Sequence, residues 1–235
     1  MRRISLMRSL AGLAALAALV AVFMVPAGAA APRRAVLPPQ AHPNGRSYSE
    51  WAALWWTWAL TQPVDSNPLL DETGEDCAVG QTGRVWFLAG TLASDPVTRE
   101  CTVPAGTKLF FPVVNYVYCA FTDDPPEQQT EEYVRSQVAF FREAAGDLEA
   151  SVDGRPVRNL QRYFEESVLF DVVLPANNVF DLPAGKVLAP CADAGFYLML
   201  APLRPGTHTI HFAGSVGDDL TLDVTYEVTV ARGGR

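Results

Sequence analysis

Two stretches near the C-terminal end alternate between apolar and polar side chains with a period of two. They are residues 206–213 and 220–230. Since successive side chains of a β-strand point to opposite faces, each stretch predicts a strand with one buried face. Short apolar runs between Pro, Gly and Asp turns predict further strands. These runs are residues 84–91, 109–114, 166–174 and 195–201.

A helical period marks two other segments. Ser47 and Glu50 have the spacing of a capping box, which predicts a helix from there to about Thr61. Its apolar stripe recurs at i, i+3, i+4 and i+7. The stripe consists of Trp51, Leu54, Trp55 and Trp58. A second helix is predicted from Pro125-Pro126 to about Ala145. Its buried stripe consists of Val134, Val138, Phe141 and Ala145.

This order of elements predicts a mainly β fold. The fold class that fits is an antiparallel β-sandwich, Ig-like or jelly-roll-like, with two peripheral α-helices. Residues 47–235 have the length of a single domain. Residues 32–46 are rich in proline and predict a flexible leader. Pro112 has no N–H to donate to a ladder, so its strand lies at an edge or bends there.

The first 31 residues have the pattern of a secretory signal peptide. Three arginines precede an uncharged apolar run over residues 10–25, and small residues follow Pro26. The run is shorter than the roughly 20 residues that a membrane-spanning helix needs, which favours cleavage over an uncleaved anchor. No cysteine follows the run as a site for a lipid, so we expect a secreted or periplasmic protein with no membrane span after cleavage.

The charge and the cysteines support the same location outside the cytoplasm. The formal charge is -8, and removal of the three signal-peptide arginines lowers it to -11. A chain this acidic is a poor candidate for binding nucleic acid or an anionic membrane. An even number of cysteines predicts two disulfides in an oxidising compartment. Of the three pairings, we favour Cys77 with Cys101 and Cys119 with Cys191, because the first brackets a strand and the second ties the middle of the chain to the C-terminal sheet.

Several motifs stand out along the chain: the Trp-rich segment at 51–58, Asn67-Pro68-Leu69-Leu70-Asp71, the VWFLAGT run at 85–91, the VPAG and FFPVVN pieces at 103–115, and PGTHTIHF at 205–212. Together they resemble a family of secreted bacterial proteins that has no assigned activity. The resemblance covers most of the chain after the signal peptide. It implies export and a shared fold, and it carries no catalytic residue over to this sequence.

Three residues are candidates for binding a ligand. Trp56 points about 100–140° away from the apolar stripe of its helix, so it either packs under another element or stacks on a sugar. Asp71 belongs to an acidic loop, residues 65–76, whose oxygen atoms could also hold Ca²⁺. Asn115 follows an apolar strand and either binds a ligand or satisfies backbone groups at the strand end.

Other chemistry is less specific. His208 and His211 have opposite parity on a strand and face opposite sides of the sheet, so no metal site and no cofactor is predicted. A glycosidase needs two carboxyl groups across a cleft. The acids that could supply them are Glu50, Asp71, Asp123, Glu165 and Glu166.

Two functions follow from these observations. The first, which we favour, is an exported non-catalytic domain that binds a cell-surface component, carbohydrate or protein partner through its loops. The alternative is a secreted hydrolase or lyase that acts on an extracellular polysaccharide through paired carboxylates. No motif in the sequence names a reaction, so whether the chain is an enzyme stays open at this point.

Overall fold

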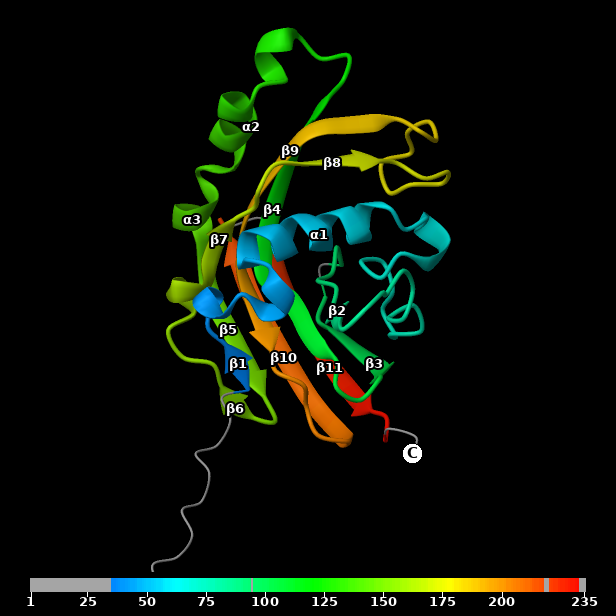
Figure 1. Ribbon diagram of the computed structural model, residues 1–235, viewed down its shortest axis with the longest axis vertical. Helices are drawn as coiled ribbons and strands as arrows, with labels where there is room; N and C mark the ends of the chain where they lie inside the picture. Colours follow the sequence, from blue (N-terminus) through cyan, green and yellow to red (C-terminus); the bar gives the residue numbers. More distant parts are fainter. Residues whose placement is uncertain (1–34, 94, 218–219, 233–235) are drawn as a thin grey trace, which may run out of the picture. The chain divides into compact units, whose positions relative to one another are not determined.

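The computed structural model describes residues 35–93, 95–217 and 220–232. The predicted signal peptide, residues 1–31, lies outside the described residues. Two β-sheets pack in the manner of a sandwich, and helices flank them (Figure 1). The prediction of a mainly β, sandwich-like fold with two helices and two disulfides is confirmed.

The first sheet, sheet A, has six strands, and the long strand β9 pairs with four of the others. Its order is β1-β9-β4-β2, and β7 and β8 also pair with β9. The strands are β1 (Val36–Leu37), β2 (Val85–Phe87), β4 (Lys108–Phe121), β7 (Phe164–Glu166), β8 (Phe170–Val173) and β9 (Val187–Leu200). The register of β4 against β9 shifts at Pro112, so the bend predicted at this proline is present as a bulge.

The second sheet, sheet B, has five strands in the order β3-β11-β10-β5-β6. The strands are β3 (Val97–Val103), β5 (Ala145–Val152), β6 (Arg155–Pro156), β10 (Gly206–Val216) and β11 (Leu220–Val230). Both sheets are mixed, whereas the sequence pattern predicts antiparallel ones: β2 is parallel to β4, and β3 is parallel to β11. The chain passes from β2 through β3 in the other sheet before it returns to β4, and such a crossover joins parallel neighbours.

The sandwich core lies between the inner faces of the two sheets. Phe111 of β4 stacks on Phe212 of β10 with 4.8 Å between ring centroids. The neighbouring Phe110 points to the other face of sheet A, where it contacts Tyr48 and Trp51 of helix α1 (Tyr48–Leu60). Helix α1, sheet A and sheet B therefore form three layers.

Helix α1 begins as the sequence predicts. The Ser47 N–H donates to the Glu50 carboxylate at 2.7 Å, and the Glu50 N–H donates to the Ser47 hydroxyl at 3.2 Å. The three tryptophans of the predicted stripe, Trp51, Trp55 and Trp58, are buried. Each indole N–H donates to a carbonyl of a separate loop segment, at distances of 2.9–3.0 Å. The stripe thus supplies both apolar area and anchors for the chain around it.

The second predicted helix is shorter and divided. A 3₁₀ turn (Pro126–Gln128) precedes α2 (Glu131–Val138), which Thr130 caps by accepting from the Tyr133 N–H. Helix α3 (Phe141–Ala144) follows, and Ala145 already begins β5. The predicted stripe is otherwise correct, because Val134, Val138 and Phe141 are buried. No helix among the described residues is both long and apolar enough to span a membrane.

The described part of the expected leader lies against the domain. Val36 and Leu37 pair with the end of β9, and 3₁₀ turns at Pro39–Ala41 and Pro43–Gly45 follow. The Tyr48 hydroxyl donates to the Leu37 carbonyl at 2.7 Å. This differs from a flexible leader, since a short strand and two buried prolines, which composition alone does not reveal, fix the segment.

The two disulfides have the predicted pairing. Cys77 is joined to Cys101 over a separation of 24 residues, and Cys119 to Cys191 over 72 residues. The second bond links directly opposite residues of β4 and β9. The first fastens the loop after α1 to the edge strand β3.

Loop length predicts how much each disulfide stabilises the fold. Replacement of Cys77 and Cys101 by alanine is expected to lower the free energy of unfolding by about 3 kcal/mol, since the open loop gains entropy in the unfolded chain. Replacement of Cys119 and Cys191 is expected to lower the free energy of unfolding by about 1 kcal/mol more, because the loop that this disulfide closes is longer. Urea unfolding of both double variants measures the order. The reverse order would show that packing around the sulfur atoms, not loop closure, sets the difference.

Candidate functional site

Trp56 lies at the contact between α1 and sheet A. Its side chain is half-buried, and its indole N–H donates to the Oδ2 atom of Asp193 at 2.7 Å. Its ring meets the Trp55 ring edge-on at 5.0 Å. Of the two placements that the sequence left open for Trp56, the structure therefore has the packed one.

Asn115 reaches the same carboxyl group through a tyrosine. The Asn115 side-chain amide donates to the Tyr197 hydroxyl at 2.9 Å, and this hydroxyl donates to Asp193 Oδ2 at 2.7 Å. The Tyr197 ring crosses Gly195, where a Cβ atom would come within 2.7 Å of it. Two predicted residues, Trp56 and Asn115, thus converge on Asp193, which was not among the predicted residues.

Asp193 is a buried carboxyl group with one free oxygen atom. Its exposure is 0%, and its Oδ1 atom has no hydrogen-bond partner among the described residues. Burial raises the pKa of Asp193 to about 8, although the hydrogen bonds from Tyr197 and Trp56 favour the charged form. At neutral pH the carboxyl group is therefore mostly protonated.

The same contact holds a second carboxyl group with a raised pKa. Glu165 of β7 pairs with Gly195, and it accepts a hydrogen bond from Ser49 of α1 at 3.3 Å. Burial raises the pKa of Glu165 above its usual value. Both carboxyl groups connect α1 to sheet A. Since Asp193 and Tyr197 have no exposed surface, this cluster acts first as a polar clamp between two layers.

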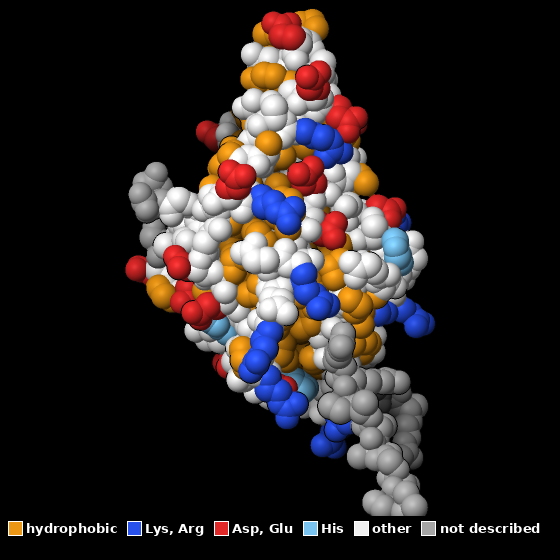
Figure 2. Space-filling model, turned by 90° about the vertical axis from the view of Figure 1, so that its left-hand side faces the viewer, with side chains coloured by type: hydrophobic (Ala, Val, Ile, Leu, Met, Phe, Trp, Pro, Cys, Tyr) orange, Lys and Arg blue, Asp and Glu red, His pale blue; other side chains and the backbone are white. Residues whose placement is uncertain are grey.

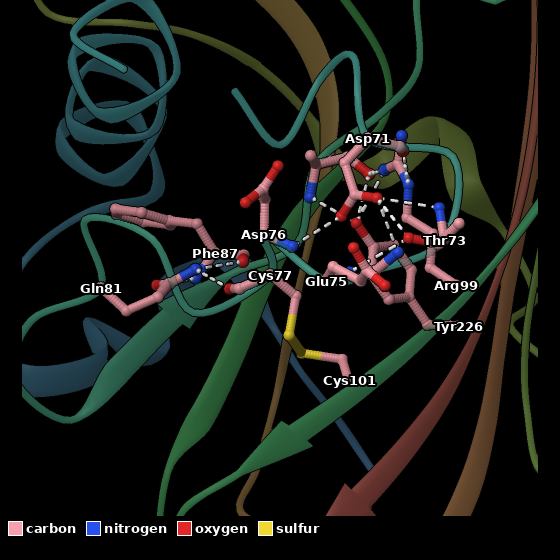
Figure 3. The surroundings of a disulfide bond; sticks show 12 residues. Asp71, Thr73, Glu75, Asp76, Cys77, Gln81, Phe87, Arg99, Cys101 and Tyr226 are labelled. Carbon is pink, nitrogen blue, oxygen red and sulfur yellow. Dashed lines mark hydrogen bonds between the residues drawn. A yellow bond between two sulfur atoms is a disulfide. The ribbon is translucent and has the colours of Figure 1, made fainter. Parts of the chain in front are cut away.

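Asp71 is used inside its own loop. Its carboxylate accepts the backbone N–H groups of Thr73, Gly74 and Asp76 at 2.8–3.0 Å. Partial burial favours the neutral form of Asp71, but these three amides outweigh it and lower the pKa. The structure does not bring Asp71 to Trp56 or Asn115; it uses Asp71 to shape the loop that begins at this residue (Figure 3).

Arg99 fixes this loop to sheet B. It is 1% exposed, and its Nε atom donates to the Asp71 carbonyl at 2.6 Å. Its Nη1 atom donates to the carbonyls of Ala89 and Gly90 and to the Tyr226 hydroxyl. Arg99 is not among the residues predicted from the sequence, because no strand was predicted over β3. Every second residue of this strand is buried, and the polar residues between them are exposed. This period of two is the signal that could have placed the Arg99 side chain inward, together with Val97, Cys101 and Val103.

An open groove lies along the outer face of sheet B beside this loop. Its volume is about 950 Å³, and β3, β11, the start of β10 and the loop around Cys77 line it. Five threonines and four carboxylates face it. The carboxylates are Glu72, Glu75, Glu100 and Glu227. No Lys, Arg or His is among the lining residues.

The wall of the groove is fixed to the edge of sheet B by backbone contacts. The Glu100 N–H donates to the Thr73 carbonyl at 2.8 Å, so the loop continues the hydrogen bonding of β3. Gly74 permits the close approach, because a Cβ atom there would lie 2.1 Å from the Glu100 carbonyl oxygen. The Cys77–Cys101 disulfide closes the same contact (Figure 3).

The other candidate acids are dispersed. Glu50 caps α1, Asp123 pairs with Lys186, and Glu166 lies 3.9 Å from Arg135. His208 binds Asp153 at 2.9 Å and His211 binds Asp223 at 3.0 Å, so each histidine has its own carboxylate. Within the described ranges, no three His, Cys, Asp or Glu side chains are grouped so that they could hold a metal ion.

The state of Asp193 predicts a pH dependence of stability. Its pKa is about 8 in the folded protein and about 3.9 in an unfolded chain. The stabilisation is therefore complete below about pH 4, declines as the pH rises, and is lost above about pH 8. Asp193→Asn removes this titration. We expect the melting temperature of the variant to fall less than that of the wild type between about pH 5 and pH 9. Parallel curves for the two proteins would contradict the assignment.

The environment of Arg99 predicts that its substitution lowers the stability of the fold strongly. Arg99→Ala leaves the carbonyls of Gly90 and Asp71 without the arginine donor, and we expect about 2–5 kcal/mol of destabilisation, since each unpaired buried group costs about 1–3 kcal/mol. Arg84→Ala is the matched control, because Arg84 is exposed and should change stability by less than about 0.5 kcal/mol. Chemical unfolding of both variants gives the comparison; equal small losses would refute the anchoring role.

Comparisons of this chain with protein-family models, with curated proteins and with solved structures find no match. What the chain binds is therefore inferred from its own residues.

Proposed function

We propose that this chain is an exported, non-catalytic binding domain, and that the groove on sheet B receives a cationic segment of a protein partner. The observation that carries this proposal is the lining of the groove by four carboxylates without a single basic side chain. Within the described residues, none of the four lies within 4.0 Å of a basic nitrogen atom. Such a surface attracts lysine and arginine side chains.

The threonines suit an extended peptide. Thr98 and Thr102 flank Glu100 on β3, and Thr229 follows Glu227 on the outer face of β11. Hydroxyl groups therefore lie beside both of these strand carboxylates. Hydroxyl groups donate to and accept from a peptide backbone while carboxylates bind its basic side chains. The fixed wall of the groove reduces the ordering that binding requires.

A basic peptide fits this surface better than a carbohydrate does. Trp56 was the candidate for stacking on a sugar, and its indole is half-buried and bonded to Asp193. No tryptophan, tyrosine or phenylalanine is among the residues that line the groove. Sugar recognition commonly uses an aromatic face. Among the partners considered for this chain, a protein is therefore the preferred one.

Export is supported by the cysteines. One disulfide joins two strands of sheet A, the other joins a loop to sheet B, and such bonds persist in oxidising compartments outside the cytoplasm. The signal-peptide pattern and the resemblance to secreted bacterial proteins agree with that location. A domain of this kind meets its partner in a periplasm or in the medium.

The alternative of a polysaccharide hydrolase or lyase has less support. Both oxygen atoms of Asp71 accept backbone amides, so this carboxylate is occupied. Asp193 has the raised pKa of a general acid, but its side chain has no exposed surface. A paired-carboxylate mechanism needs both groups in contact with substrate.

Binding of a labelled lysine-rich peptide tests the proposal. We expect fluorescence anisotropy to show binding that weakens as salt rises, because exposed charges are screened. Glu100→Gln with Glu227→Gln should weaken binding roughly tenfold, since two ion pairs are lost. Glu127→Gln with Glu132→Gln removes the same charge from exposed positions outside the groove and should leave affinity unchanged. Equal effects of the two pairs would refute the groove as the binding site.

A further inference from the structure

The part of sheet B farthest from the groove borders an exposed basic surface. Four arginines lie on or beside α3, β6 and the 3₁₀ turn Leu160–Tyr163, and we call them the arginine face. They are Arg142, Arg155, Arg158 and Arg162. All four are exposed, and within residues 35–232, as far as these are described, no side-chain hydrogen bond or ion pair engages their guanidinium groups.

Two of these guanidinium groups are held in place by aromatic rings. Arg142 lies over the Phe164 ring at 4.5 Å, and Arg162 lies over the Tyr163 ring at 4.9 Å. Phe164 in turn packs against the buried Phe196. Stacking fixes the plane of a guanidinium group and leaves its N–H edges free for carboxylates. Arg142 and Arg162 of the arginine face are thus ordered before they meet a partner.

The space-filling view shows the side of the molecule that carries α2, α3 and β7. In the lower half of this view Lys and Arg side chains lie near the centre with hydrophobic side chains between them, whereas in the upper half acidic side chains lie among the basic ones (Figure 2). This distribution contrasts with the formal charge of the whole chain, which is -8. Positive charge is therefore gathered in the lower half of this face although the protein is acidic.

The groove and the arginine face belong to opposite edges of one sheet. Sheet B runs in the order β3-β11-β10-β5-β6, with the groove along β3 and β11 and Arg155 on β6. The groove offers carboxylates without a basic partner, and the arginine face offers guanidinium groups without an acidic one. Arg–carboxylate pairs are strong and directional because both groups are planar and bond in pairs.

We propose that the cationic partner of the groove is a second copy of this chain, whose arginine face docks into the acidic groove. This inference rests on the proposed function and names its partner. The two contacting surfaces differ, so the contact is head-to-tail. Each pair leaves one groove and one arginine face unused, and further copies can add at both ends.

The test is sedimentation velocity of the purified, disulfide-intact protein over a concentration series. At about 20 mM salt we expect the mean mass to rise with concentration, and at about 500 mM salt we expect monomers, because the contact is electrostatic. Arg142→Gln with Arg162→Gln, or Glu100→Gln with Glu227→Gln, should each weaken self-association roughly tenfold. Arg84→Gln, an exposed arginine outside both surfaces, is the control and should associate like the wild type.

Mixing the two double variants gives the decisive measurement. Each retains one intact surface, so an equimolar mixture should form pairs and stop at two chains, whereas the wild type continues to grow. A wild type that stays monomeric at low salt, or that associates equally well in all variants, overturns the inference. Binding of dextran sulfate to the arginine face without self-association also overturns it and assigns that face to polyanions. If the lysine-rich peptide still binds the groove in these cases, the proposed function survives and only the identity of the partner fails.

Discussion

The guanidinium group of Arg99 holds together three segments that are far apart in the sequence. It bonds the loop at Asp71, the chain after β2 at Ala89 and Gly90, and the Tyr226 hydroxyl of β11. A buried cation requires such partners, because its loss of hydration is otherwise too costly. The position of the groove wall follows from this constraint, since the loop that forms it is bonded to Arg99 at one end and to Cys101 at the other.

The elements that a simple period marks could be predicted from the sequence. The tryptophan stripe and the capping box define α1, and the alternation near the C-terminus defines β10 and β11. The disulfide pairing followed from which strands the cysteines bracket. Parallel neighbours could not be predicted, because the order in which strands are placed in two sheets depends on crossovers that leave no local pattern. The division of the second helix could not be predicted either, because Ala145 pairs with β10, a strand that lies far away in the sequence.

The candidate site was predicted only in part. Trp56 and Asn115 were chosen as polar or amphipathic residues beside apolar ones, and they do converge, but on Asp193 and Tyr197. A lone acid within an apolar run, as in Ala192-Asp193-Ala194, is the sequence signal for such a group. Its partners come from α1 and β4, and only the packing of layers brings them together. Asp71 is the opposite case. The sequence suggests a carboxylate free to bind a ligand, but in the structure it accepts backbone N–H groups of its own loop.

The crossover from β2 through β3 to β4 also determines when this fold can close. β3 pairs with β11, and Val36 of β1 pairs with Leu200. Strands from the first half of the chain therefore cannot pair until strands near its end are present. Contacts this distant in sequence slow folding and leave strand edges uncovered meanwhile. A chain that is synthesised from its N-terminal end therefore leaves β3 without its partner until β11, the last strand, has been made. The Cys77–Cys101 bond needs no such wait, because both of its cysteines are made early.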